Sequence, residues 1–296
     1  MSEQEETVAI PEAIDIAMQH HHEGRLYDAE ILFRRILETQ PNQPIALHFL
    51  GIIAHQVGNN DVAVEYITKA LDQKPDYAEA HNNLGNALRA LGNIEGAVNS
   101  YQRGLQHKPG MAETHNNLGV ALLDLGNLDD AISNFQKAVV INPDYGDALN
   151  NLGLTLYELA STAEAEESYR KALIVMPDRA EIHFNLGNLM RGTTRLDQAQ
   201  TSFQNALSLK SDYPEAHYNL GLVLHDLGKL EEAATHYEKA LALQPESAEI
   251  YNDLGNTVWA LGDAETAAAN YRKALSLEPN YPEAHNNLAV LYQIHR

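Results

Sequence analysis

The chain has 296 residues and a formal net charge of -21, from 20 lysine and arginine residues against 41 aspartate and glutamate residues. Such a surface repels phosphate backbones and anionic membrane surfaces, so we expect neither nucleic acid nor a membrane as its partner. The absence of cysteine excludes disulfides and thiolate metal sites. No basic stretch with an apolar core opens the sequence, and no apolar run has the length of a membrane span, so a soluble cytoplasmic protein is expected.

Residues 1–9 are acidic at their start and are expected to form a disordered tail. From residue 10 onward, proline, glycine and alanine each recur with a period of 34 residues. The columns are Pro41, Pro75, Pro109, Pro143, Pro177, Ser211, Pro245 and Pro279; Gly51, Gly85, Gly119, Gly153, Gly187, Gly221, Gly255 and Ala289; and Ala29, Ala63, Ala97, Ala131, Ala165, Ala199, Ala233 and Ala267. Three columns at one period predict a repeat array in which each unit packs on its neighbours.

Eight full units occupy residues 10–281, and a half unit with one terminal helix occupies residues 282–296. The full units begin at Ile10, Pro44, Ala78, Ala112, Gly146, Ala180, Pro214 and Ala248. Each unit is expected to contain two helices, and the third unit shows the signals. An Asp76/Glu79 capping box precedes a first helix that ends at about Leu91, and Gly92 provides a positive φ. Asn93 then caps the second helix, as Asn127, Ser161 and Asp263 do in other units, until Pro109 stops it.

The same unit carries a family motif: Leu84, Gly85, Ala97, Tyr101, Gly104 and Pro109. This pattern resembles the tetratricopeptide repeat. The resemblance implies an all-α, right-handed superhelical solenoid of antiparallel helix pairs, whose first helices line a concave groove that binds protein partners. The tryptophan usual near the start of each unit is missing. Histidines that we interpret as packing residues replace it in five units: His81, His115, His183, His217 and His285.

A column of asparagines in the first helices is the candidate binding site. It contains Asn83, Asn117, Asn151, Asn185, Asn219 and Asn287, while Phe49 and Asp253 depart from it. Asparagine is a poor helix former at these mid-helix positions, so another role must favour it. An amide matches a peptide unit in its donors and acceptors, and a ladder of amides can hold an extended chain. Asn86, Asn188 and Asn256 lie one turn further along the same face. For the asparagines one residue before the column, binding and packing are both open: Asn82, Asn116, Asn150, Asn252 and Asn286.

The resemblance extends to the repeat arm of O-GlcNAc transferase-type proteins, which implies that these asparagines contact substrate peptide. Two interpretations of the column stay open. The amides hold a partner segment, or they bond to neighbouring helices and orient the stack. The acidic column beside them is Glu79, Glu113, Asp147, Glu181, Glu215, Glu249 and Glu283. It disfavours the carboxylate clamp of chaperone adaptors and favours a neutral or basic partner.

No phosphate loop, nucleophile elbow or metal-binding His motif is present, so we expect no catalysis and no cofactor. The preferred function is a scaffold that binds an extended peptide in the groove. Two alternatives remain. The chain is the substrate-recruiting arm of a larger glycosyltransferase, or it self-associates through residues 282–296, where Val290, Leu291 and Ile294 present an apolar face.

Overall fold

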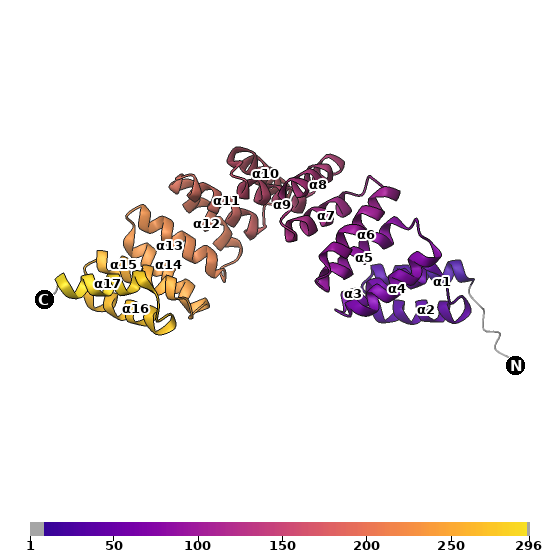
Figure 1. Cartoon of the computed structure of the whole chain (residues 1–296), viewed down its shortest axis with the longest axis horizontal. Coiled ribbons are helices and arrows are strands. Elements are labelled where there is room, and N and C mark those ends of the chain that lie inside the picture. The colour runs from indigo at the N-terminus through magenta and orange to yellow at the C-terminus, as the bar shows by residue number, and fades with distance from the viewer. Residues whose placement is uncertain (1–8, 295–296) are drawn as a thin grey trace. The chain divides into compact units, whose positions relative to one another are not determined.

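The computed structural model describes residues 9–294, so most of the tail expected over residues 1–9 lies outside the described residues. The described residues form seventeen α-helices and no strands (Figure 1). The first helices of the pairs are α1 (Ile10–His22), α3 (Pro44–Gln56), α5 (Ala78–Ala90), α7 (Ala112–Asp124), α9 (Gly146–Glu158), α11 (Ala180–Gly192), α13 (Pro214–Asp226) and α15 (Ala248–Ala260). The second helices are α2 (Leu26–Thr39), α4 (Asn60–Gln73), α6 (Ile94–His107), α8 (Leu128–Ile141), α10 (Thr162–Val175), α12 (Leu196–Leu209), α14 (Leu230–Leu243) and α16 (Ala264–Leu277). Helix α17 (Pro282–Ile294) follows.

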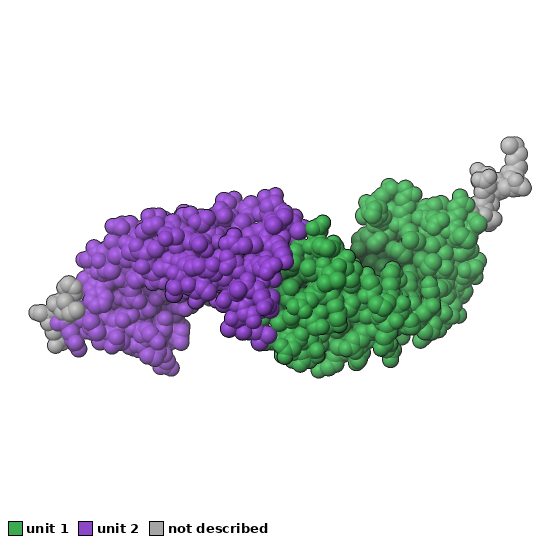
Figure 2. Space-filling model, turned by 90° about the horizontal axis from the view of Figure 1, so that it is seen from above, with its two compact units in different colours: residues 1–155 green, residues 156–296 purple. Residues whose placement is uncertain are grey.

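The chain divides into two compact units, residues 1–155 and residues 156–296, and the division falls within α9 (Figure 2). In the first unit, α1 packs on α2, α3 on α4, α5 on α6 and α7 on α8, and successive first helices also touch. In the second unit, α11 packs on α12, α13 on α14, α15 on α16, and α16 on α17. The predicted all-α array of helix pairs is confirmed.

The recurring glycines make room for an aromatic column in the second helices. A Cβ atom on Gly85 would lie 2.4 Å from the Tyr101 ring, and one on Gly119 would lie 2.6 Å from the Phe135 ring. Tyr101 and Phe135 are fully or almost fully buried between the two helices of their pairs. The glycine column therefore allows each aromatic ring to lie against the backbone of the facing first helix.

The histidine column does more than pack. In all five units the Nε2 atom lies 2.9–3.1 Å from the carbonyl oxygen of the residue six positions earlier. The acceptors are the carbonyl oxygens of Pro75, Pro109, Pro177, Ser211 and Pro279. Because a carbonyl only accepts, Nε2 must carry the proton. Each of these histidines thus ties its first helix to the turn that precedes it.

The helix ends agree only in part with the expected caps. Gly92 has a φ of 78°, and the side chain of Asn93 accepts from the Gly96 amide. The Asp76/Glu79 capping box is wrong, since Tyr77 precedes the first helical residue and Asp76 lies one position too early. Asn127 and Ser161 occupy N-cap positions without a side-chain cap bond, whereas Asp263 accepts from Thr266.

Candidate functional site

The asparagine column lies half-buried along the first helices, and its amides bond from one first helix to the one before it. Asn83 Nδ2 donates to His48 Nε2 at 2.8 Å, and Asn151 Nδ2 donates to Asn116 Oδ1 at 3.0 Å. Each acceptor stands 35 residues before its donor. The column is therefore part of a side-chain network that connects successive repeats.

Two members of the column use both of their amide hydrogens in this way. Asn117 Nδ2 donates to Asn82 Oδ1 and to Asn86 Oδ1, each at 3.2 Å. Asn287 Nδ2 makes the same pair of bonds, to Asn252 Oδ1 at 2.9 Å and to Asn256 Oδ1 at 3.0 Å. Asn86 Oδ1 also accepts from the buried Tyr101 hydroxyl at 2.7 Å, and Asn256 Oδ1 accepts from the buried Tyr271 hydroxyl at 2.9 Å. The aromatic core is thus linked to the amide network.

The exceptions in the column follow the chemistry of the preceding repeat. Phe184 stands 35 residues before Asn219, and its ring offers no acceptor. Asn219 Nδ2 donates instead to the Glu215 carbonyl at 2.9 Å. Tyr218 stands 35 residues before Asp253, and its hydroxyl donates to Asp253 Oδ2 at 2.8 Å. At Tyr218 and Asp253 the earlier residue is the donor, and the column residue is an acceptor.

The asparagines one position before the column prove central to this network. Asn82, Asn116 and Asn252 are buried one position before the column and supply its acceptors. Their recurrence 35 residues before an asparagine is the signal that marks them. Asn185 lies on α11 in the same register, and the backbone carbonyl of Asn188 accepts from the Tyr157 hydroxyl at 3.4 Å.

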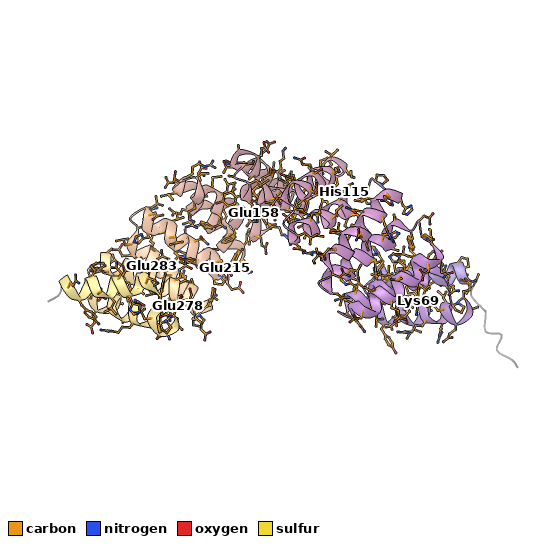
Figure 3. The ribbon with its side chains drawn as sticks, in the orientation of Figure 1. Lys69, His115, Glu158, Glu215, Glu278 and Glu283 are labelled. Carbon is orange, nitrogen blue, oxygen red and sulfur yellow. The ribbon has the colours of Figure 1, made fainter. Side chains whose placement is uncertain are left out.

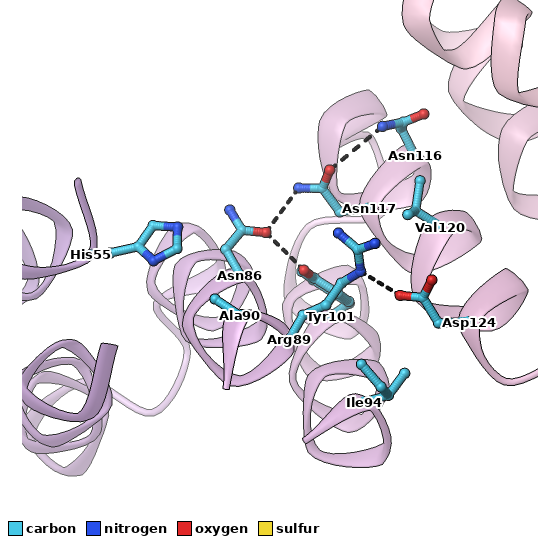
Figure 4. A pocket seen from close by; sticks show the side chains of 10 residues that line it. All are labelled: His55, Asn86, Arg89, Ala90, Ile94, Tyr101, Asn116, Asn117, Val120 and Asp124. Atoms are coloured by element: carbon cyan, nitrogen blue, oxygen red, sulfur yellow. Dashed lines mark hydrogen bonds and ion pairs between the residues drawn. The ribbon is translucent and has the colours of Figure 1, made fainter. Parts of the chain in front are cut away.

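A cavity of about 560 Å³ opens on the face formed by α3, α5 and α7, with the start of α6 at one side (Figure 4). We call this face, together with its continuation along the first helices of each unit, the first-helix face. Asn86, Asn116 and Asn117 line the cavity, so two amides of the predicted set and one from the preceding position meet in one place. His55 and Val120 also line it, from α3 and α7.

The charges in this cavity are balanced. Arg89 Nε donates to Asp124 Oδ2 at 2.6 Å, which connects α5 to α7 and leaves the terminal guanidinium nitrogens available (Figure 4). His55 Nδ1 lies 2.6 Å from Asn60 Oδ1. The cavity thus offers amide oxygens, one guanidinium group and one imidazole, which is a set of groups suited to a polar, uncharged chain.

The acidic column borders the same face. Glu79 bonds to Lys108 at 2.7 Å, and this hydrogen bond holds the pKa of the Glu79 carboxyl below its usual range. The other members are exposed: Glu113, Asp147, Glu181, Glu215, Glu249 and Glu283 (Figure 3, where Glu215 and Glu283 are labelled). From Glu113 onward the border therefore carries a negative potential in each repeat.

The described part of the chain contains no cluster of three or more histidine and acidic side chains placed to hold a metal ion. None of the helices within residues 9–294 combines the length and the apolar character that a membrane crossing requires.

Comparison with known proteins identifies the repeats. A model described as "TPR repeat" matches residues 85–126, 195–228, 223–262 and 260–293. Models described as "Tetratricopeptide repeat" match residues 110–178, 66–99 and 46–79. The sequence matches none of the curated proteins with which it was compared.

Several solved structures are similar to this chain. YrrB, described as a TPR protein with an unusual peptide-binding site, is 20% identical, with a TM-score of 0.57 over 64% of this chain and 97% of that chain. PilF of Pseudomonas aeruginosa is 22% identical, with a TM-score of 0.64 over 75% of this chain and 99% of that chain. MamA is 25% identical, with a TM-score of 0.52 over 55% of this chain and 95% of that chain. At these identities the likeness shows the fold.

Proposed function

Since the chain belongs to the tetratricopeptide repeat family, whose members are protein interaction scaffolds, we propose that it binds an extended segment of a partner protein on its first-helix face. The observation that carries the proposal is the cavity over α3, α5 and α7, in which three asparagine side chains lie beside an arginine and a histidine. A peptide-binding site in the structurally similar YrrB is consistent with such a role.

In the first compact unit the floor of the proposed site is Asn83, Asn117 and Asn151, with Asn86 beside it. We propose the same role within the second compact unit for Asn185, Asn219 and Asn287, with Asn188 and Asn256 beside them. Both amide hydrogens of Asn117 are engaged within the protein. An amide oxygen has two lone pairs, however, so an oxygen that accepts one bond in the network can accept a second from a peptide N–H. The oxygens of Asn86 and Asn256 already accept two bonds each, but Asn117 Oδ1 accepts only one, from Asn116. Oxygens such as that of Asn117 thus offer acceptors to the backbone of the bound segment, largely independently of its sequence.

The acidic border indicates the charge of the partner. Exposed carboxylates along the first helices repel an acidic segment and attract a neutral or basic one, and this attraction chiefly raises the association rate. We therefore expect the bound segment to be neutral or basic.

The proposal is tested with Val120→Arg, which places a long side chain in the cavity without removing any bond of the amide network. Peptides selected from a displayed random library by the native chain serve as probes, and their affinity is measured by fluorescence anisotropy. We expect Val120→Arg to weaken binding by about tenfold or more, equivalent to roughly 1.4 kcal/mol.

Gln102→Arg on the exposed face of α6 is the matched control, because it introduces the same charge away from the cavity. It should bind as tightly as the native chain, and circular dichroism should show equal helicity for all three proteins. Equal affinities of native chain and Val120→Arg would overturn the proposal and move the binding surface away from the first helices.

A further inference from the structure

Two cavities lie at equivalent positions of the repeat, one in each compact unit. One has a volume of about 680 Å³ and is lined by α4, α5 and α6. The other has a volume of about 540 Å³ and is lined by α12, α13 and α14. We call them the α4–α6 cavity and the α12–α14 cavity. Because their lining residues correspond four repeats apart, the chain itself supplies a comparison between the two.

The α12–α14 cavity is lined by an apolar side chain from each of its three helices. Leu220 of α13 is fully buried and forms its floor, while Leu207 of α12 and Leu243 of α14 form its sides. Leu243 is 45% exposed, so the cavity opens to solvent. An open apolar cavity of this size favours a ligand whose apolar group leaves water on entering it.

The two histidines of this cavity bond to groups of the protein. His217 Nε2 donates to the Ser211 carbonyl at 3.1 Å, and the Nδ1 atoms of His217 and His236 lie 3.0 Å apart. Burial lowers the pKa of both rings, that of His236 to about 4, so neither ring is charged at neutral pH. The histidines therefore add ring surface to the lining and no charge.

The α4–α6 cavity has polar side chains where the α12–α14 cavity has apolar ones. His107 stands at the place of Leu243, and Gln106 stands at the place of Ala242. The packing of the repeats therefore does not require apolar residues at these two exposed positions of α14. A ligand that enters the α12–α14 cavity would account for them.

The charges of the two linings differ as well. Asp72 and Arg103 line the α4–α6 cavity, and their charges balance. In the α12–α14 cavity Ser208 stands at the place of Asp72, and Lys239 stands at the place of Arg103. Lys239 is exposed and is the single charged residue among the described ones that line this cavity. Its ammonium group therefore meets no carboxylate in the lining and can pair with one from a bound molecule.

We propose that the α12–α14 cavity binds an apolar side chain of a partner protein, while a neighbouring carboxylate of that partner pairs with Lys239. The partner segment is thus acidic and amphipathic. The net charge of -21 opposes the approach of such a segment. At physiological ionic strength, however, exposed charges further apart than about 8 Å are largely screened, so the lysine at the cavity has the greater effect on the bound carboxylate.

This site goes beyond the binding proposed for the first-helix face. Helix α13 carries Asn219 of the asparagine column and Leu220 of the α12–α14 cavity. Adjacent residues of a helix point about 100° apart, so the two side chains serve different sides of α13. The first-helix face favours a neutral or basic segment, whereas the α12–α14 cavity favours an acidic one.

The test uses isocaproate as the probe, because it joins the isobutyl group of leucine to a carboxylate. The full chain is labelled with nitrogen-15 histidine and observed by nuclear magnetic resonance at about pH 7.5, where the probe is ionised. We expect a saturable shift of the His217 and His236 resonances and none of the His81 resonance, which reports on the α4–α6 cavity. The uncharged isocaproamide should bind about threefold more weakly, and acetate should cause no shift.

A double variant removes the apolar lining of α14. Ala242→Gln combined with Leu243→His copies Gln106 and His107 of the α4–α6 cavity, and it should weaken isocaproate binding by about tenfold or more. Both residues already occupy these positions in another repeat, so circular dichroism should show native helicity. Unchanged binding by the double variant would overturn the proposal.

Lys239→Asn tests the charge by itself. It copies Asn205, which stands one repeat earlier in the same column, and it should bind isocaproate and isocaproamide equally well. A preference for isocaproate that persists in Lys239→Asn would contradict the assigned role of the lysine. The absence of a saturable shift at His217 and His236, or a shift of equal size at His81, would overturn the proposal as a whole.

Discussion

The hydroxyl of Tyr218 donates to Asp253 across two successive first helices, at 2.8 Å. Other hydrogen bonds between side chains 35 residues apart run the opposite way, with the later residue as the donor: Asn117 donates to Asn82, and Asn287 donates to Asn252. Donor and acceptor have therefore changed together at positions 35 residues apart. Such a matched exchange is expected where a half-buried polar network must stay satisfied.

Asp253→Asn is predicted to stabilise the chain at neutral pH. Burial raises the pKa of the Asp253 carboxyl above its ordinary value of 3.8, although the bond from Tyr218 opposes this shift. The folded state then binds more protons than the unfolded state just above pH 3.8, so stability from this group falls as the pH rises through that window. Asparagine keeps an acceptor for the Tyr218 hydroxyl without the charge, and it gives up only the longer bond from Asn252 Nδ2 at 3.3 Å. We expect a gain of about 1 kcal/mol at pH 7.5 that shrinks toward pH 4.

Urea unfolding at both pH values measures this difference. Asp226→Asn, on the exposed end of α13, removes the same charge without the burial and should show no such pH dependence. A constant difference between native chain and Asp253→Asn at the two pH values would contradict the prediction.

Asn117→Asp is predicted to destabilise the first compact unit, residues 1–155. The substitution removes both N–H donors and sets a negative charge against Asn82 Oδ1 and Asn86 Oδ1. The loss of satisfied half-buried bonds is expected to lower the free energy of unfolding by about 2–3 kcal/mol. Thermal denaturation compares it with Asn99→Asp, which adds the same charge at an exposed position of α6. Equal melting temperatures for the two variants would show that the network carries no stability.

His48→Asn is predicted to reduce the acid sensitivity of the chain. Burial lowers the pKa of His48 to about 4, so the folded state binds fewer protons than the unfolded state between about pH 4 and pH 6.5. Stability from this group is complete above pH 6.5 and declines as the pH falls through that window. Asparagine can still accept from Asn83, as Asn82 accepts from Asn117.

Urea midpoints at pH 7 and pH 4.5 test this expectation. The native chain should lose on the order of 2 kcal/mol more than His48→Asn over this interval. His22→Asn, at an exposed position of α1, serves as the control and should follow the native chain. Parallel losses in native chain and His48→Asn would refute the prediction.

Ala160→Gly is predicted to stabilise the chain. Six turns between the helices of a pair contain a glycine of positive φ, but Ala160 and Thr194 adopt φ values of 58° and 59° at the same place. A left-handed conformation costs an L-residue about 1–2 kcal/mol, part of which glycine recovers. The melting temperature should rise, and the free energy of unfolding should increase by about 0.5–1 kcal/mol. Gly92→Ala, where a Cβ would meet no atom within 4 Å, should lower the melting temperature by a similar amount. A lower melting temperature for Ala160→Gly, or a higher one for Gly92→Ala, would contradict the prediction.

Much of the fold could be predicted from the sequence because it depends on local, periodic signals. The columns of proline, glycine and alanine fix helix length and register, and the first helices begin at Ile10, Pro44, Ala78 and their equivalents. Gly92 ends its helix with a positive φ, as expected from its place after Leu91. The capping box at Asp76 was wrong because an acid and a glutamate at the right spacing do not show where the first helical residue falls.

The position of the asparagine column on the first helices could be predicted, but its hydrogen bonds could not. Sequence alone located Asn83, Asn117 and Asn287 on one face of the first helices, because helical periodicity is a property of the chain. Which partners their amides meet depends on how one repeat stacks on the next, and only the tertiary structure brings Asn117 Nδ2 within 3.2 Å of Asn82 Oδ1. The apolar α12–α14 cavity likewise follows from packing, since three different helices line it. Local periodicity therefore determined the elements and their faces, while the contacts between repeats decided which polar atoms remain available.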